Sequence, residues 1–222
     1  MHASFWIERW QAGQIGFHEG APNRFLQRFA ARLEPAQSVF VPLCGKAIDL
    51  DALASAGKRV VGSELVPLAA QQYFAERGVE PRVRSTAFGE VHEAPTEQVG
   101  AGSVAIVVGD VFHFELEGPP FDAIYDRAAL VALEPSTRDR YAAKLASLLR
   151  DDGRILLVVF EHDAPSGPPH SVPREEIERL FGAAFTIEPL ASEPLVDEAT
   201  RWRERGATFA REVAYLLVRK AR

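Results

Sequence analysis

The residue with the clearest chemical signature in this sequence is Glu64, which lies at the end of the apolar run 59–65. It follows the loop glycine Gly45 by about 20 residues, the spacing at which an acid at the end of a second strand meets a ribose. Its carboxylate could accept hydrogen bonds from the two ribose hydroxyls. On this pattern alone, the alternative is an ordinary strand–helix–strand unit with a surface-exposed Glu64. The pattern indicates a nucleoside ligand.

The loop around Gly45, which precedes the expected helix 47–56, indicates which class of nucleoside ligand binds. Dinucleotide sites normally carry G-x-G-x-x-G, which lets the backbone approach a pyrophosphate, whereas this loop has only Gly45. S-adenosylmethionine has the same adenosine but no phosphate, and backbone N–H groups at a helix start can hold its carboxylate. The loop therefore favours methyl transfer over the hydride transfer of a nicotinamide-dependent reductase.

Three more charged residues follow apolar runs. Asp110 comes after the run 103–108, where it could accept a hydrogen bond from an adenine amino group or simply cap a turn or helix. Asp126 and Arg127 come directly after the run 121–125. Arg127 could hold an anionic planar substrate, with Asp126 orienting the guanidinium or relaying a proton. The alternative is a structural ion pair between neighbouring elements.

Glu64, Asp110, Asp126 and Arg127 can form one site only if the strands that precede them end at the same edge of a sheet. Short apolar runs alternate with amphipathic segments, which predicts an α/β doubly wound sheet of seven strands, mostly parallel, with an antiparallel last pair. The segment 81–102 is expected to be a short edge strand or an excursion. The strands are expected at 38–42, 59–65, 103–108, 121–125, 153–160, 185–190 and 212–218, and the helices at 22–33, 47–56, 67–77, 135–149 and 174–181.

Two loops could cover the ligand. The segment 5–20 contains two tryptophans and two phenylalanines, and three glycines that favour a pliant loop acting as a lid. A helix packed against the sheet is the alternative, and His18 is either a substrate contact or structural. The proline-rich segment 164–173 is too stiff for a random linker, so we expect it to wall the substrate pocket.

Composition limits the class of protein. The 222 residues, of which 47% are hydrophobic, predict a single domain spanning residues 1–222 with a cover segment at 1–33. A net charge of −6 without a long Lys/Arg run argues against nucleic acid. One cysteine and six scattered histidines argue against a structural metal. No apolar segment resembles a signal peptide or a membrane span, so we expect a cytoplasmic protein. We also expect it to be a monomer.

Taken together, these segments resemble the thiopurine S-methyltransferase family, in its bacterial form, nearly end to end. PLCGK together with GFHE is the specific combination. The matching stretches are FWIERWQAGQIGFHE, VFVPLCGKAIDL, VVGSEL, YDRAALVAL and SGPPHSVP.

The resemblance implies a class I S-adenosylmethionine-dependent methyltransferase fold and a set of site residues. Arg127 and Asp126 are implied as catalytic, and Phe17, Arg127 and His170 as substrate contacts. Three positions depart from the family pattern: Ser63 replaces the usual valine, Val66 a common serine, and His170 an aromatic in the proline loop. The residues implied to contact S-adenosyl-L-methionine are Trp6, Trp10, Phe17, Leu43, Glu64, Asp110, Val111 and Arg127.

The implied reaction is an in-line transfer of a methyl group to a small-molecule thiol such as a thiopurine. Because the sulfonium already activates the leaving group, holding the two reactants could supply roughly 7–11 kcal/mol without a strong base. Selenium or tellurium species, small thiols and halides are alternative acceptors, since soft nucleophiles share the same geometric demand. A noncatalytic binding protein would leave Arg127 and the aromatic cover unexplained.

Overall fold

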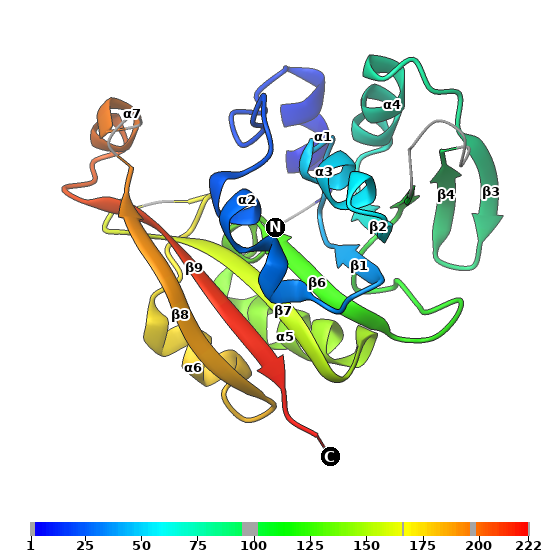
Figure 1. The fold of residues 1–222 in the computed structure, drawn as a ribbon. Coiled ribbons are helices and arrows are strands. Elements are labelled where there is room, and N and C mark those ends of the chain that lie inside the picture. The colour runs from blue at the N-terminus through cyan, green and yellow to red at the C-terminus, as the bar shows by residue number, and fades with distance from the viewer. Residues whose placement is uncertain (1–2, 95–101, 166, 196–198, 222) are drawn as a thin grey trace. The chain divides into compact units, whose positions relative to one another are not determined.

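The computed structural model describes residues 3–94, 102–165, 167–195 and 199–221. Its contacts divide the chain into two compact units, Met1–Tyr125 and Asp126–Arg222. Each unit is built on its own set of neighbouring strands (Figure 1).

The first unit carries a sheet in the order β3-β4-β5-β2-β1-β6. Its four apolar strands pair in parallel, as their sequence pattern predicts. They are β1 (Ser38–Val41), β2 (Arg59–Glu64), β5 (Ser103–Val108) and β6 (Phe121–Arg127), whose last two residues belong to the second unit. An antiparallel hairpin, β3 (Arg82–Thr86) with β4 (Gly89–Glu93), forms the edge and is shown in teal in Figure 1.

Helices of the first unit bury one apolar stripe each. Leu50, Leu53 and Ala54 are the buried stripe of α3, and Ala69, Ala70, Tyr73 and Phe74 that of α4. Proline occupies the first turn of α4. The bounds are α1 (Ala3–Gln11), α2 (Arg24–Phe29), which continues into the 3-10 turn Ala30–Leu33, α3 (Asp49–Ser55) and α4 (Pro67–Glu76).

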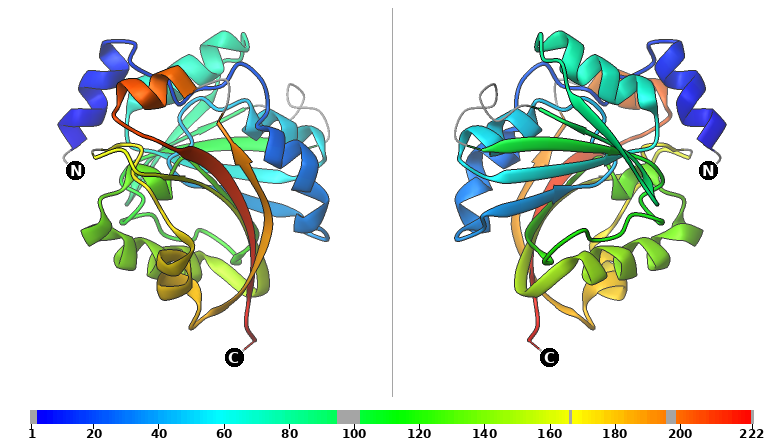
Figure 2. Two further views of the ribbon diagram at one scale, coloured as in Figure 1. Left: turned by 90° about the vertical axis from the view of Figure 1, so that its left-hand side faces the viewer. Right: turned by 90° about the vertical axis from the view of Figure 1, so that its right-hand side faces the viewer.

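The second unit has three antiparallel neighbours in the order β7-β9-β8. The helices α5 and α6 lie on one face of these strands (Figure 2). Two 3-10 turns, Leu130–Ala132 and Pro135–Thr137, connect β6 to α5. The elements are α5 (Arg138–Leu148), β7 (Leu149–His162), α6 (Arg174–Phe181), β8 (Phe185–Pro194), α7 (Ala199–Glu204) and β9 (Ala210–Arg219).

All seven predicted strands are present, and the final antiparallel pair is confirmed. Two expectations about the rest of the chain need correction. The described residues contain nine strands and not seven, because the segment expected to be a short edge strand or an excursion forms the two-stranded edge hairpin β3–β4 within residues 82–93. Residues 95–101 of the segment 81–102 lie outside the description. The segment 5–20 is not only a pliant loop, because its first part belongs to helix α1, whose Trp10 has buried partners.

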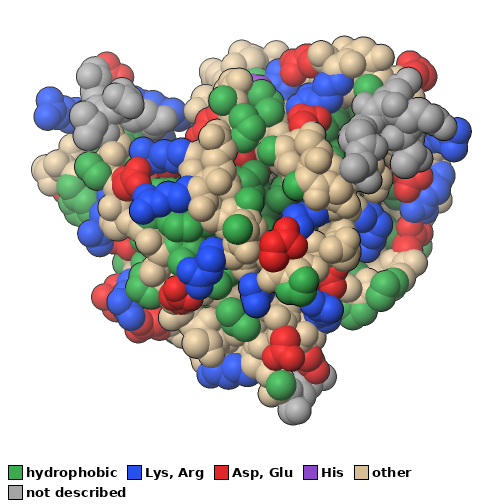
Figure 3. All heavy atoms as spheres, in the orientation of Figure 1, with side chains coloured by type: hydrophobic (Ala, Val, Ile, Leu, Met, Phe, Trp, Pro, Cys, Tyr) green, Lys and Arg blue, Asp and Glu red, His purple; other side chains and the backbone are tan. Residues whose placement is uncertain are grey.

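Charged side chains of both signs are interspersed on the face drawn in Figure 3. Several of them form exposed ion pairs, such as Arg84 with Glu117 and Arg174 with Glu178. Within the described ranges, no helix is long and apolar enough to cross a membrane. No group of three potential metal-ligating side chains occurs among these residues either.

Candidate cofactor and acceptor sites

The carboxylate of Glu64 lies at the carboxyl end of β2 and is held by backbone amides. Its Oε2 accepts a hydrogen bond from the amide of Gly45 at 2.9 Å, and its Oε1 accepts one from the amide of Val66 at 2.8 Å. Burial raises the pKa of this carboxyl group, and the amide hydrogen bonds oppose that rise. Glu64 is only 7% exposed, so the alternative of an ordinary surface-exposed glutamate is wrong.

The glycine that pairs with Glu64 sits beneath the aromatic residues of the N-terminal segment. Gly45 has a φ of +54°, which glycine adopts without strain. A Cβ atom on it would lie 3.3 Å from Cζ2 of Trp10 and 3.9 Å from Cε2 of Phe17. The ring of Phe17 packs edge to face against both Trp6 and Trp10. Three of the predicted cofactor contacts therefore form one aromatic cluster over the loop.

This aromatic cluster is anchored to the start of α4. Trp10 is 4% exposed and packs with Val66 and Ala69. Val66 is also the residue whose amide binds Glu64, so the N-terminal cluster and the carboxylate share one neighbour. The departure from serine at this position replaces a hydroxyl by an apolar contact for Trp10.

The turn between β1 and α3 is fitted closely against β2. Leu43 has a φ of +47°, and the amide of Cys44 donates to the carbonyl of Ser63 at 2.9 Å. A Cβ on Gly62 would lie 2.5 Å from Sγ of Cys44, so only glycine fits there. Burial raises the pKa of the Cys44 thiol, which makes it a packing residue and not a nucleophile.

Asp110 and Val111 lie beside Glu64 on the same rim. β2 and β5 are parallel with Glu64 opposite Val108, and the amide of Gly109 donates to the carbonyl of Glu64 at 2.8 Å. Oδ1 of Asp110 accepts from the amide of Phe112 at 2.9 Å, so this side chain caps a turn. Because its side chain is 42% exposed, Asp110 can also accept from a ligand. Val111 is buried.

The remaining predicted residues belong to the second unit. Asp126 is fully buried, and its carboxylate accepts from the hydroxyl of Tyr141 at 2.8 Å and from the amide of Leu130 at 3.2 Å. Burial raises the pKa of Asp126 to about 6. Arg127, the last residue of β6, is half-buried.

His170 is fixed at its backbone and at its ring. Its amide donates to the carbonyl of Val131 at 2.7 Å. A Cβ on Gly167 would lie 2.4 Å from Nδ1 of His170, so the imidazole lies directly against this glycine. The pKa of His170 is lowered, first by burial and then by the positive charge of Arg138. The imidazole is therefore neutral near pH 7.

Sequence reasoning missed Tyr141 and Arg138 as neighbours of these residues. Tyr141 is buried on α5, and its hydroxyl donates to Asp126. Arg138 is completely buried, although the exposed Arg140 lies only two residues further along the same charged helix start. No periodic signal separates a buried arginine from an exposed one in a charged helix start.

The first-unit site fits S-adenosylmethionine. Glu64 presents a buried carboxylate at the strand end, Gly45 leaves room beneath Trp10 and Phe17, and Asp110 keeps an accessible oxygen. A single-glycine loop of this kind suits an adenosine without phosphates. Fold and site together define a class I S-adenosylmethionine-dependent methyltransferase.

Comparison with known proteins identifies the family. The profile of the family described as thiopurine S-methyltransferase matches residues 1–220. The thiopurine S-methyltransferase of Xanthomonas axonopodis pv. citri is 38% identical over 225 residues, covering 99% of this chain and all of that protein. That of Xanthobacter autotrophicus is 42% identical over 200 residues, covering 88% and 91%. This chain belongs to the thiopurine S-methyltransferase family, and S-adenosyl-L-methionine is its methyl donor.

Solved structures agree on the fold. The 1,6-didemethyltoxoflavin N1-methyltransferase of Burkholderia thailandensis superposes with a TM-score of 0.66 at 22% identity, covering 99% of this chain and 87% of that one. The magnesium protoporphyrin IX methyltransferase of Synechocystis gives a TM-score of 0.65 at 14% identity, covering 99% and 100%. At these identities the likeness concerns the fold alone.

Proposed function

We propose that this methyltransferase acts on the sulfur of aromatic and heterocyclic thiols such as thiopurines. The observation that carries the proposal is family membership over residues 1–220, joined with a half-buried arginine, Arg127, at the end of the inner strand β6. We further propose that both units act as one methyltransferase domain, a cytoplasmic monomer in which residues 1–33 serve as a cover.

The donor residues have one task in this proposal, which is to hold the cofactor. S-adenosylmethionine supplies a methyl group that is already activated by the positive sulfonium. Glu64 would accept from the ribose, Asp110 from the adenine amino group, and Trp6, Trp10 and Phe17 would cover the ligand and exclude water. Leu43 and Val111 would contact its apolar surface. Holding the reactants in this way can provide roughly 7–11 kcal/mol of the acceleration.

The main role of Arg127 in this proposal is to bind the methyl acceptor, although the family resemblance also implies that it contacts the donor. A guanidinium offers a planar pair of N–H donors that suits a flat anionic heterocycle, and a heteroaromatic thiolate is such a group. Phe17 and His170 would complete the acceptor contacts. Because the carboxylate of Asp126 is fully buried and accepts from Tyr141 and Leu130, we assign it a positioning role for the end of β6.

Two assays test the proposal. Calorimetric titration with S-adenosylhomocysteine and with NADPH separates a methyltransferase from a reductase. Methyl transfer is then measured across a panel of thiopurines, small thiols, selenite and halides. Turnover on thiopurines well above the other acceptors would support the proposal, whereas transfer only to selenite or halides would refute the thiol assignment.

Variants at Arg127 test its role. Arg127→Lys keeps the charge but loses the planar fork, so KM for a thiopurine should rise while the affinity for S-adenosylhomocysteine stays nearly unchanged. A melting curve for each variant controls for unfolding. Wild-type kinetics in both Arg127→Lys and Arg127→Ala would remove Arg127 from the acceptor site.

A further inference from the structure

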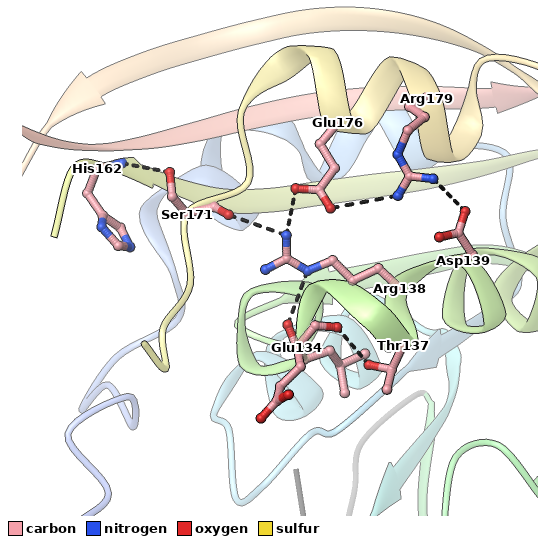
Figure 4. Close-up of polar contacts among 9 residues, drawn as sticks. Glu134, Thr137, Arg138, Asp139, His162, Ser171, Glu176 and Arg179 are labelled. Atoms are coloured by element: carbon pink, nitrogen blue, oxygen red, sulfur yellow. Dashed lines mark hydrogen bonds and ion pairs between the residues drawn. The ribbon is translucent and has the colours of Figure 1, made fainter. Parts of the chain in front are cut away.

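The second unit contains a fully buried guanidinium that joins three segments of the chain. Arg138, the first residue of α5, donates from Nε to the carbonyl of Leu133 at 3.1 Å and from Nη1 to the carbonyl of Ser171 at 3.3 Å. Nη1 also donates to Oε2 of Glu176 on α6 at 2.7 Å. Figure 4 shows the guanidinium between these groups.

The segments joined by Arg138 are those that carry the acceptor residues. Leu133 ends the stretch that follows Arg127, and Ser171 adjoins His170 in the proline loop. The two stretches are also bound directly, through the His170 amide and the Val131 carbonyl at 2.7 Å. In the same loop, Oγ of Ser171 accepts from the amide of His162 at 3.0 Å. Arg138 is thus the side chain that ties the proline loop to the 127–133 stretch.

A buried ion pair such as Arg138–Glu176 contributes little net free energy to the stability of the fold. Removing two charges from water costs as much as their attraction returns, and apolar residues of similar volume often replace a buried pair at no loss. Nη2 of Arg138 has no hydrogen-bond partner among the described residues, which adds to the cost. The contribution of the Arg138–Glu176 pair is therefore positional: the three hydrogen bonds of Arg138 hold Leu133, Ser171 and Glu176 in a fixed arrangement.

We propose that the buried Arg138–Glu176 ion pair is a positioning device for the acceptor: it fixes the proline loop against the stretch after Arg127 and so determines how well a thiol is held. The inference rests on the proposed function, because it assigns the effect to acceptor binding. Arg138 acts through His170 and the two backbone segments, without touching the acceptor.

The charge of Arg138 gives this role a spectroscopic signature. The charged and titratable groups around His170 are Glu134, Arg138, Arg205 and His162. Since the positive charge of Arg138 lowers the pKa of His170, removing that charge should raise it towards its ordinary value. This change reports that the Arg138 charge has been lost beside a folded His170, while the positioning role itself is decided by kcat/KM for the acceptor measured against donor affinity.

The decisive variant is the double substitution Arg138→Met/Glu176→Met, which removes both charges and leaves no buried charge unpaired. The matched control is Arg179→Gln, since Arg179 is exposed and pairs with Asp139 across the same two helices. Its Nη2 also lies 3.9 Å from Oε1 of Glu176, so the control removes a charge beside the pair while it leaves the Arg138–Glu176 bond in place (Figure 4). For each protein we would measure melting temperature, affinity for S-adenosylhomocysteine, kcat/KM for a thiol acceptor, and the His170 titration by NMR.

In the double variant we expect kcat/KM to fall roughly ten- to a hundredfold, as for a misplaced binding group, with donor affinity unchanged and the His170 pKa raised. Arg179→Gln should match the wild type in all four measurements. A folded double variant with wild-type kcat/KM would overturn the proposal, whatever its His170 titration. If the wild type binds S-adenosylhomocysteine but methylates no thiol, the proposed acceptor class fails, and kcat/KM of the double variant for the acceptor that the wild type does methylate then decides the positioning role.

Discussion

The carboxylate of Glu64 accepts a hydrogen bond from the amide of Gly45 at 2.9 Å, which links the end of β2 to the loop that follows β1. The two strands are parallel neighbours, so the acid of one and the glycine loop of the other meet on one rim. A second amide, that of Val66, fixes the other carboxylate oxygen at 2.8 Å. The acid is therefore oriented by the protein before any ligand contributes.

Replacing Glu64 should weaken donor binding. For Glu64→Ala we expect a loss of roughly 1.5–3 kcal/mol in affinity for S-adenosylhomocysteine, the value of hydrogen bonds to a charged group. Glu64→Gln should be nearly as damaging, because its NH2 group would face one of the two backbone N–H donors. Calorimetry measures both, with the exposed Glu115→Gln as the control. Unchanged affinity in Glu64→Ala would move the site elsewhere.

Gly45→Ala should weaken donor binding by about tenfold, or 1.4 kcal/mol, because its methyl group would lie 3.3 Å from Trp10 and force that ring to shift. Gly78→Ala is a matched control, with a φ of +63° and no atom within 4 Å of the added carbon. Both variants should lose roughly 1–2 kcal/mol of stability through backbone strain. Equal donor affinity in the two variants would show that the aromatic cluster does not shape the site.

The N-terminal segment should become more resistant to protease when the donor site is filled. Trp10 anchors it to α4, while Trp6 and Phe17 are only partly buried and can gain contacts from a ligand. Limited proteolysis with and without S-adenosylhomocysteine measures cleavage within residues 1–20. Cleavage that is equally slow in both conditions would mean that this segment is a fixed part of the core.

Asp126 should make the protein less stable as the pH rises from about 4 to about 6. Its pKa is about 6 in the folded chain and 3.8 without burial, so the folded state holds the extra proton in this window. The free energy of unfolding then falls with rising pH, by at most about 1.4 kcal/mol per pH unit. Asp126→Asn removes this fall, because the side chain no longer titrates.

Denaturant unfolding at several pH values between 4 and 7 checks this expectation. The comparison is between slopes, since Asp126→Asn also changes the bond to Tyr141. Asp139→Asn, an exposed substitution in the adjoining helix, should keep the wild-type slope. Equal slopes in the wild type and in Asp126→Asn would show that the carboxyl group is ionised throughout.

Much of the fold was determined by local pattern. Continuous apolar runs predicted β1, β2, β5 and β7, since strands buried on both faces cannot alternate with polar residues. The segment 81–102 was expected to be a short edge strand or an excursion, and its two-stranded form was missed because β3 is exposed along most of its length and mixes charges with threonine. The periodicity that marks a buried strand is absent from such an edge.

The candidate site, like the fold, has one part that local sequence pattern predicts and another that only the tertiary structure shows. The sequence by itself determined that Glu64, Asp110 and Arg127 end apolar runs, and chain connectivity then places Glu64 and Asp110 on neighbouring strand ends. Only the tertiary structure decided that Trp10 lies over Gly45, that Tyr141 donates to Asp126, and that Arg138 is buried between Leu133, Ser171 and Glu176. These contacts join residues far apart in the chain, and no local propensity encodes which distant partners the packing of helices and loops will bring within hydrogen-bond distance.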